Sequence, residues 1–170
     1  DQSSAASDVY KRQLEFNPFK LIGKDWFLLT SGNLSEYNTM TASWGQLGFV
    51  WNAPVFTTVV RPNRKTFELI EKNEYFTVSF FDEKYRSALN FCGSHSGRDC
   101  DKAKETGLTP AEFDGCTAFE EAKLIFVCRK LYNQDMQSEN FIDKSLLKFY
   151  EKDPLHKAFT GEIVSVYKKK

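Results

Sequence analysis

Residues 38–44 (NTMTASW) decide the fold, because they alternate between polar and packing side chains as a half-exposed strand does. Successive side chains point to opposite faces of a strand, which gives two sets: Thr39, Thr41 and Ser43 on one face, and Met40, Ala42 and Trp44 on the other. The hydroxyl face could hydrogen-bond a planar polar ligand or a phosphate. Threonines selected only for β propensity would give the same row, so the row by itself does not establish a ligand.

Segments of similar composition lie on both sides of this one. Runs rich in β-branched and aromatic residues predict further strands at 25–30, 55–61, 75–81, within 122–132, and at 161–167. Helices are expected at 63–73, 83–91, 101–106 and 143–150. Strands and helices do not alternate regularly, so an antiparallel barrel or sandwich with helices packed outside is favoured over parallel βαβ winding.

The size and charge of the chain exclude several classes of protein. Its 170 residues suit one domain, and we expect a loose polar arm at 1–13 followed by a single domain over 14–170. Lys plus Arg and Asp plus Glu both number 23, so no overall basic field exists to hold nucleic acid. No apolar run approaches the roughly 20 residues that span a bilayer, so we expect no membrane partner.

The cysteine and histidine content argues against a metal site. Four cysteines (Cys92, Cys100, Cys116 and Cys128) and two histidines show none of the spacings of a zinc site. Four thiols in a chain of this length do not make a disulfide scaffold, so reduced cysteines and a cytoplasmic location are expected. The sequence begins at Asp1, and a removed export signal would leave no trace in it.

Residues 61–66 (RPNRKT) are the strongest candidate for an anion site. A strand is expected to end and a helix to begin here, with Asn63 as the N-cap and Arg64, Lys65 and Thr66 in the first turn. That turn exposes unpaired N–H groups and the positive end of the helix dipole, which suits a phosphate. The alternative is that the long basic side chains simply point into water.

Two other places carry residues with chemical potential. Residues 90–102 (NFCGSHSGRDCDK) are expected to form a loop that contacts ligand. A nucleophilic pair of Cys92 and His95 is conceivable there, but no third group that would orient the histidine is evident. His156 precedes the last strand; a lone histidine is more often structural, although its titration range suits a role beside a redox centre.

Taken together, these blocks resemble the flavin reductase-like family. The resemblance rests on five segments that keep the family's order: residues 38–45 (NTMTASWG), 51–54 (WNAP), 60–66 (VRPNRKT), 92–99 (CGSHSGRD), and His156 with 161–164 (GEIV). The fold that it implies is mainly β with flanking helices, a Greek-key antiparallel split β-barrel. Homodimers are usual in the family, and 26 aromatic residues are more than one small core must hide.

The resemblance also implies a function. Family members hold FMN noncovalently, and many pass electrons from NADH or NADPH through FMN to a flavin, iron or a protein acceptor. The implied roles by position are these: Thr41, Ala42, Ser43 and Trp44 along the flavin and its ribityl chain, Arg61, Arg64, Lys65 and Thr66 around the phosphate, Ser96, Gly97, Arg98 and Asp99 closing the pocket, and His156 near the ring or the nicotinamide.

Two other functions remain open from the sequence. The same pocket would serve an FMN or haem carrier, or a ligand sensor, without nicotinamide turnover. A barrel that binds single-stranded nucleic acid is weaker, because such sites need a basic groove. The chain has no G-x-G-x-x-G segment, so nothing in it identifies the nicotinamide donor.

Overall fold

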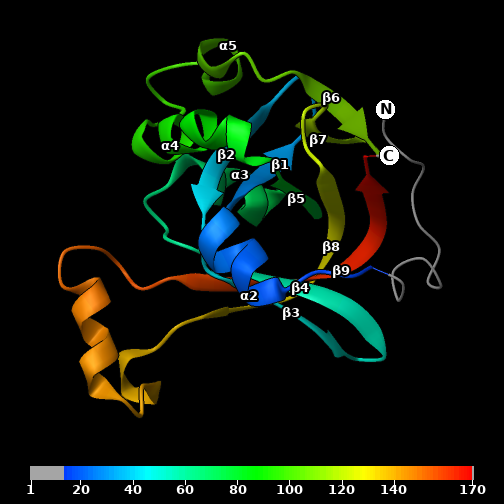
Figure 1. Ribbon diagram of the computed structural model, residues 1–170. Helices are drawn as coiled ribbons and strands as arrows, with labels where there is room; N and C mark the ends of the chain where they lie inside the picture. The colour runs from blue at the N-terminus through cyan, green and yellow to red at the C-terminus, as the bar shows by residue number, and fades with distance from the viewer. Residues whose placement is uncertain (1–13, 170) are drawn as a thin grey trace.

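A computed structural model describes residues 14–169, so the predicted arm at 1–13 lies outside the described residues. Strands make up most of the regular secondary structure (Figure 1). Their bounds are β1 Phe27–Gly32, β2 Tyr37–Ala42, β3 Gly45–Val50, β4 Ala53–Val60, β5 Tyr75–Phe80, β6 Pro110–Phe113, β7 Cys116–Phe119, β8 Leu124–Asp135 and β9 Lys157–Lys168. The helices and helical turns are α2 Pro18–Lys20, η1 Leu21–Asp25, α3 Lys65–Lys72, η2 Glu83–Tyr85, α4 Arg86–Ser94, α5 Lys102–Thr106, η3 Ser138–Asn140 and η4 Lys144–Tyr150.

Seven strands form one sheet in the order β2-β1-β5-β8-β9-β4-β3, and β6 pairs with β7 in a separate hairpin. Every pairing among the described strands is antiparallel. β4 pairs with β9 rather than with β5, the next strand of this sheet along the chain, so the sheet is not a simple meander. β2 and β3 are consecutive in the chain but lie at the two edges of the sheet, and only residues 43–44 separate them.

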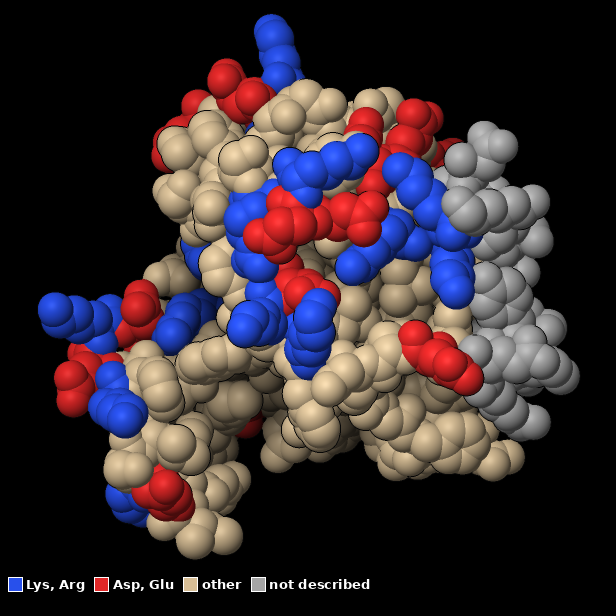
Figure 2. Space-filling view, in the orientation of Figure 1, with Lys and Arg blue, Asp and Glu red and all other residues tan. Residues whose placement is uncertain are grey.

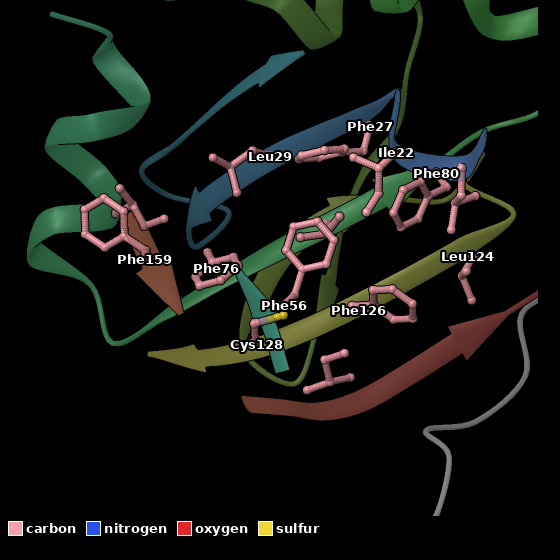
Figure 3. Packing of buried hydrophobic residues seen from close by; sticks show 14 of the residues in the cluster. Ile22, Phe27, Leu29, Phe56, Phe76, Phe80, Leu124, Phe126, Cys128 and Phe159 are labelled. Carbon is pink, nitrogen blue, oxygen red and sulfur yellow. The ribbon is translucent and has the colours of Figure 1, made fainter. Parts of the chain in front are cut away.

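Aromatic side chains fill the interior enclosed by the curved sheet (Figure 3). The Phe27 ring meets the Phe56 ring edge-on at 5.4 Å, and the Phe80 ring meets the Phe126 ring in the same way at 5.7 Å. These four side chains are fully buried and come from β1, β4, β5 and β8. Each buried phenylalanine contributes roughly 1.5–3 kcal/mol through the apolar surface that it removes from water. The core therefore ties strands from across the sheet together.

A second layer covers the outer face of the central strands. Helices α4 and α5 and the β6–β7 hairpin lie together on one side of the molecule (Figure 1). Leu89 of α4 and Phe119 of β7 belong to the same buried cluster as Ile125 and Val127 of β8. Because side chains alternate along a strand, Phe126 faces the inner core while Ile125 and Val127 face this outer layer. The first part of β8, residues 124–128, is therefore buried on both faces.

The expected strands are all present with shifted ends, and three further strands were not predicted. β3 (GQLGFV) carries two glycines, which weaken a strand pattern, and β6 and β7 have only four residues each. The helix expected at 83–91 begins as the 3₁₀ turn η2 and continues as α4. The helix expected at 143–150 is the 3₁₀ segment η4, within a connection between β8 and β9 that projects from the sheet (Figure 1).

Within residues 14–169, no helix is long and apolar enough to cross a membrane.

Candidate functional site

Strand β2, the start of α3 and the loop after α4 surround a pocket of about 410 Å³. Its lining consists of Asn38, Met40, Arg61, Asn63, Arg64, Lys65, Thr66, His95, Ser96, Gly97, Arg98, Lys102 and Asp153. A smaller pocket of about 150 Å³ is lined by Met40, Thr41, Ala42, Ser43, Trp44, Val59, Arg61, Arg64 and His156. Because Met40, Arg61 and Arg64 line both, the two pockets adjoin. We call them the phosphate pocket and the ring pocket, after the parts of FMN that the family resemblance predicts for their residues.

Positive charge dominates the phosphate pocket. Five basic side chains line it against a single carboxylate, that of Asp153: Arg61, Arg64, Lys65, Arg98 and Lys102. Within residues 14–169, the Arg64 guanidinium has no hydrogen-bond or ion-pair partner. The first turn of α3 adds N–H groups and the positive end of the helix dipole. Arg98 is paired with the Glu68 carboxylate, whereas the other four cations have no ion-pair partner in the described part of the chain. Unpaired cations at a helix start suit a doubly charged anion such as a phosphate monoester.

The start of α3 differs from the prediction that Asn63 is its N-cap. The N-cap is Arg64, and its N–H bonds to the Arg61 carbonyl at 3.1 Å, which closes a turn over Pro62 and Asn63. Proline and asparagine suit the two central positions of such a turn, so the chain turns there before it becomes helical. Lys65 still lies in the first helical turn, as expected.

The loop of residues 95–99 is attached to α3 across the phosphate pocket. Lys65 Nζ donates to the Gly97 carbonyl at 3.2 Å, and the Arg98 guanidinium bonds to the Glu68 carboxylate and to the Asn63 carbonyl. Ser96, Gly97 and Arg98 thus line the pocket together with the start of α3. Asp99 instead lines a neighbouring pocket of about 590 Å³.

Lys102 is a site residue that the sequence analysis did not identify. Only 6% of it is exposed, and its Nζ donates to the carbonyls of Thr39 and Cys92, both at 2.8 Å. Burial lowers the pKa of Lys102. An ammonium has three donors, so one remains for a ligand in the phosphate pocket. The only sequence signal was its place at the end of the polar loop of residues 90–102.

Two hydroxyl groups of the β2 row form hydrogen bonds to neighbouring segments of the protein. Thr39 Oγ1 lies 2.8 Å from Thr30 Oγ1 and donates to the Leu29 carbonyl at 3.2 Å, and Thr41 Oγ1 donates to the Leu89 carbonyl. Both threonines therefore join β2 to its neighbours, which is a structural use of the row. Thr41 still lines the ring pocket with Ala42, Ser43 and Trp44.

His156 lies at the ring pocket, in an aromatic cluster. Its Nδ1 is 2.7 Å from the Tyr150 hydroxyl, and its ring centroid is 5.5 Å from that of Trp44. Burial, with Arg61 and Arg64 nearby, lowers the pKa of His156 to about 4. The imidazole is therefore neutral near pH 7, which suits hydrogen bonding better than proton donation.

Arg61 also anchors the connection between β8 and β9. Its guanidinium donates to the Pro154 carbonyl at 3.0 Å and to the Phe149 carbonyl at 3.3 Å, and it lies over the Tyr150 ring. The Phe149 ring in turn meets Trp44 edge-on at 5.3 Å. The connection between β8 and β9 therefore contacts Arg61 and Trp44, which also line the two pockets.

The nucleophilic pair considered for Cys92 and His95 does not form. Cys92 is buried, and burial raises the pKa of its thiol to about 11. His95 stacks on Phe91 at 3.8 Å, and its Nδ1 lies within bonding distance of the Phe91 carbonyl and the Ser94 hydroxyl. A protonated, buried thiol with no imidazole partner is not an activated nucleophile.

A family model described as the flavin reductase like domain matches residues 20–170. The chain belongs to this family. The predicted family is thereby confirmed, and the blocks of residues on which the resemblance rested all lie within the matched segment.

Solved structures share the fold at low sequence identity, and 56 chains match. An FMN-binding protein of Thermus thermophilus with bound p-hydroxybenzaldehyde is 22% identical with a TM-score of 0.66, covering 85% of this chain and 71% of that one. The flavoredoxin of Desulfovibrio vulgaris (Miyazaki F) is 20% identical with a TM-score of 0.67, covering 85% and 69%.

A protein of Shewanella frigidimarina with a split barrel domain is 18% identical with a TM-score of 0.68, covering 96% of this chain and 79% of that one. The predicted fold class, a mainly antiparallel split barrel with flanking helices, is confirmed. No curated protein matches the chain.

Proposed function

We propose that this protein binds FMN and acts as an FMN-dependent oxidoreductase that passes electrons from NADH or NADPH to a flavin, iron or a protein acceptor. The observation that carries the proposal is the group of five cations around the start of α3 and the loop facing it, directly beside a pocket whose lining includes Trp44 and His156. Membership of the flavin reductase-like family and the likeness to an FMN-binding protein support it.

The residues of the two pockets fit the two ends of FMN. Arg61, Arg64 and Lys65 would hold its phosphate with the first turn of α3. The isoalloxazine ring would lie in the ring pocket, where Trp44 and His156 form part of the wall. FMN, when bound, supplies the redox chemistry, while the protein binds and orients it. The neutral His156 would supply a hydrogen-bonding group beside the ring.

The phosphate contacts give the first prediction. Replacing both Arg61 and Lys65 by alanine should weaken FMN binding at least about tenfold, the change that corresponds to roughly 1.4 kcal/mol. Titration of FMN fluorescence measures this. The control is the double variant Lys24→Ala/Lys104→Ala, which also removes two positive charges but from exposed positions outside both pockets. Unchanged FMN affinity in the Arg61/Lys65 variant would remove the proposed phosphate site.

Steady-state oxidation of NADH and NADPH, with FMN and an electron acceptor, tests the catalytic part. Turnover supports the oxidoreductase. Bound FMN that neither nicotinamide reduces would favour the alternative, an electron carrier without nicotinamide turnover. The likeness to a flavoredoxin is the observation that favours this alternative.

A homodimer is part of the proposal. Hairpin β3–β4 and α2 border an apolar groove of about 780 Å³, and Phe19 and Phe49 within it are 85% and 65% exposed. Figure 2 shows few charged side chains over the lower right of the molecule, where this hairpin lies in Figure 1. Exposed aromatic surface with little charge is typical of the buried centre of a subunit interface.

A further inference from the structure

Asn38 connects the three segments that form the phosphate pocket. It is the second residue of β2, it is 7% exposed, and it lines the pocket itself. Its Nδ2 donates to Thr66 Oγ1, in the first turn of α3, at 2.8 Å. Thr66 is fully buried, so this bond fixes the helix start against β2.

The side-chain amide of Asn38 also packs against the loop of residues 95–98. A Cβ placed on Gly97 would lie 1.9 Å from Oδ1 of Asn38 and 2.8 Å from its Cγ, so the loop backbone rests directly on the Asn38 side chain. Any side chain at position 97 would have to lift the loop or displace the amide. Glycine is therefore required there by close approach and not by its backbone angles.

The contact between Asn38 and Gly97 affects the position of two cations of the pocket, Lys65 and Arg98. The Gly97 carbonyl accepts from Lys65 Nζ at 3.2 Å, so the position of the loop sets the position of the ammonium. The adjacent Arg98 guanidinium is held by Glu68 and by the Asn63 carbonyl. A loop lifted from Asn38 would move both cations relative to the start of α3. Affinity for a phosphate depends steeply on such positioning, because charge-assisted hydrogen bonds need good geometry.

We propose that Asn38 is a positioning residue that makes the protein selective for the phosphorylated flavin, by seating Gly97 and Thr66 around the phosphate pocket. The proposal deepens the proposed function and rests on it. Asn38 would act through Lys65, Arg98 and the start of α3, while the ring pocket would remain as it is. FMN and riboflavin share the ring and differ in the phosphate. Comparing their affinities therefore distinguishes a change in the phosphate pocket from a change in the ring pocket.

The experiment measures the dissociation constants of FMN and of riboflavin for the wild-type protein and for Asn38→Ala and Gly97→Ala. Each variant should weaken FMN binding about tenfold, equivalent to roughly 1.4 kcal/mol, and leave riboflavin binding within about twofold. The ³¹P resonance of bound FMN should also move, while the visible spectrum of the flavin stays unchanged. Gly23→Ala is the matched control, because a Cβ there meets nothing within 4 Å.

A double-mutant cycle tests whether the two residues act through their contact. Asn38→Ala removes the three atoms nearest to an alanine methyl at position 97, so Gly97→Ala should cost almost nothing further in that background. Additive losses would overturn the proposed contact.

Equal weakening of FMN and riboflavin binding would overturn the positioning role of Asn38. A wild-type protein that binds neither flavin would instead overturn the proposed function. If Asn38→Ala does not fold, the FMN-to-riboflavin ratio of Gly97→Ala decides.

Discussion

At the scale of the residue, His156 shows how the fold sets the charge of a side chain. Burial and the nearby Arg61 and Arg64 guanidinium groups favour the neutral imidazole, and the Tyr150 hydroxyl holds Nδ1. The folded protein therefore binds a proton at this site less readily than the unfolded chain does. The free energy of unfolding must then depend on pH in the range where the folded and unfolded chains differ in the protonation of His156.

The direction of that dependence follows from the pKa. Between the ordinary value of 6.5 and the folded value of about 4, the unfolded chain carries the extra proton. The contribution of His156 is therefore fully present above about pH 6.5 and is lost as the pH falls towards 4. The free energy of unfolding, measured with urea, should fall between pH 7.5 and pH 4.5 in the wild-type protein. In His156→Gln this fall should be smaller by about 2–3 kcal/mol. The same pH dependence in both proteins would contradict this.

Sequence reasoning selected those pocket-lining residues whose chemistry is visible in a short segment. The run of residues 61–66 combines charge with a predicted helix start, so it points to an anion without any tertiary information. Lys102 and Asn38 were missed because their roles come from partners far along the chain. Lys102 bonds to a carbonyl 63 residues away, and Asn38 bonds to a hydroxyl 28 residues away. No local pattern carries such contacts.

At the scale of the element, β8 joins the two layers of the fold. It pairs with β5 on one side and with β9 on the other, and its side chains enter both buried clusters. Phe126 packs against Phe56, Phe80 and Phe16. A change on this strand is therefore expected to affect the whole core.

Phe126→Ala tests that expectation. Removing a fully enclosed ring leaves a cavity, so the free energy of unfolding should fall by about 3–5 kcal/mol, measured by urea denaturation. Ile142→Ala is the comparison, because Ile142 is 100% exposed and lies outside the groove, so its loss should cost less than about 0.5 kcal/mol. Similar losses in the two variants would show that β8 does not hold the layers together.

The elements that the sequence predicted are those with strong local patterns. β5 (YFTVSF) and β9 are rich in aromatic and β-branched residues, and they were placed to within a few residues. β3 was missed because its glycines hide an edge strand whose existence depends on pairing with β4. Asn63 was misassigned as a cap because a turn over Pro62 delays the helix, and a turn and a cap favour the same residues.

At the scale of the whole molecule, the uncovered groove beside β3 predicts self-association. Two copies that cover Phe49 would bury aromatic surface that is otherwise in water. Sedimentation at two concentrations should show a dimer for the wild-type protein and a dimer at least about tenfold weaker for Phe49→Glu.

Leu34→Glu is the control for this prediction. Leu34 is 50% exposed but lies outside the groove, so the same charge placed there should leave association unchanged. A wild-type protein that sediments as a monomer at both concentrations would rule out the homodimer.

The two edge strands of the main sheet have a consequence for how a ligand would come and go. The chain passes from one edge to the other through Ser43 and Trp44, and both residues line the ring pocket. The pocket thus opens at the seam where no backbone ladder closes the barrel. The flavin proposed to bind there could therefore leave and be replaced while every strand pairing stays intact, so its exchange would require no opening of the hydrophobic core.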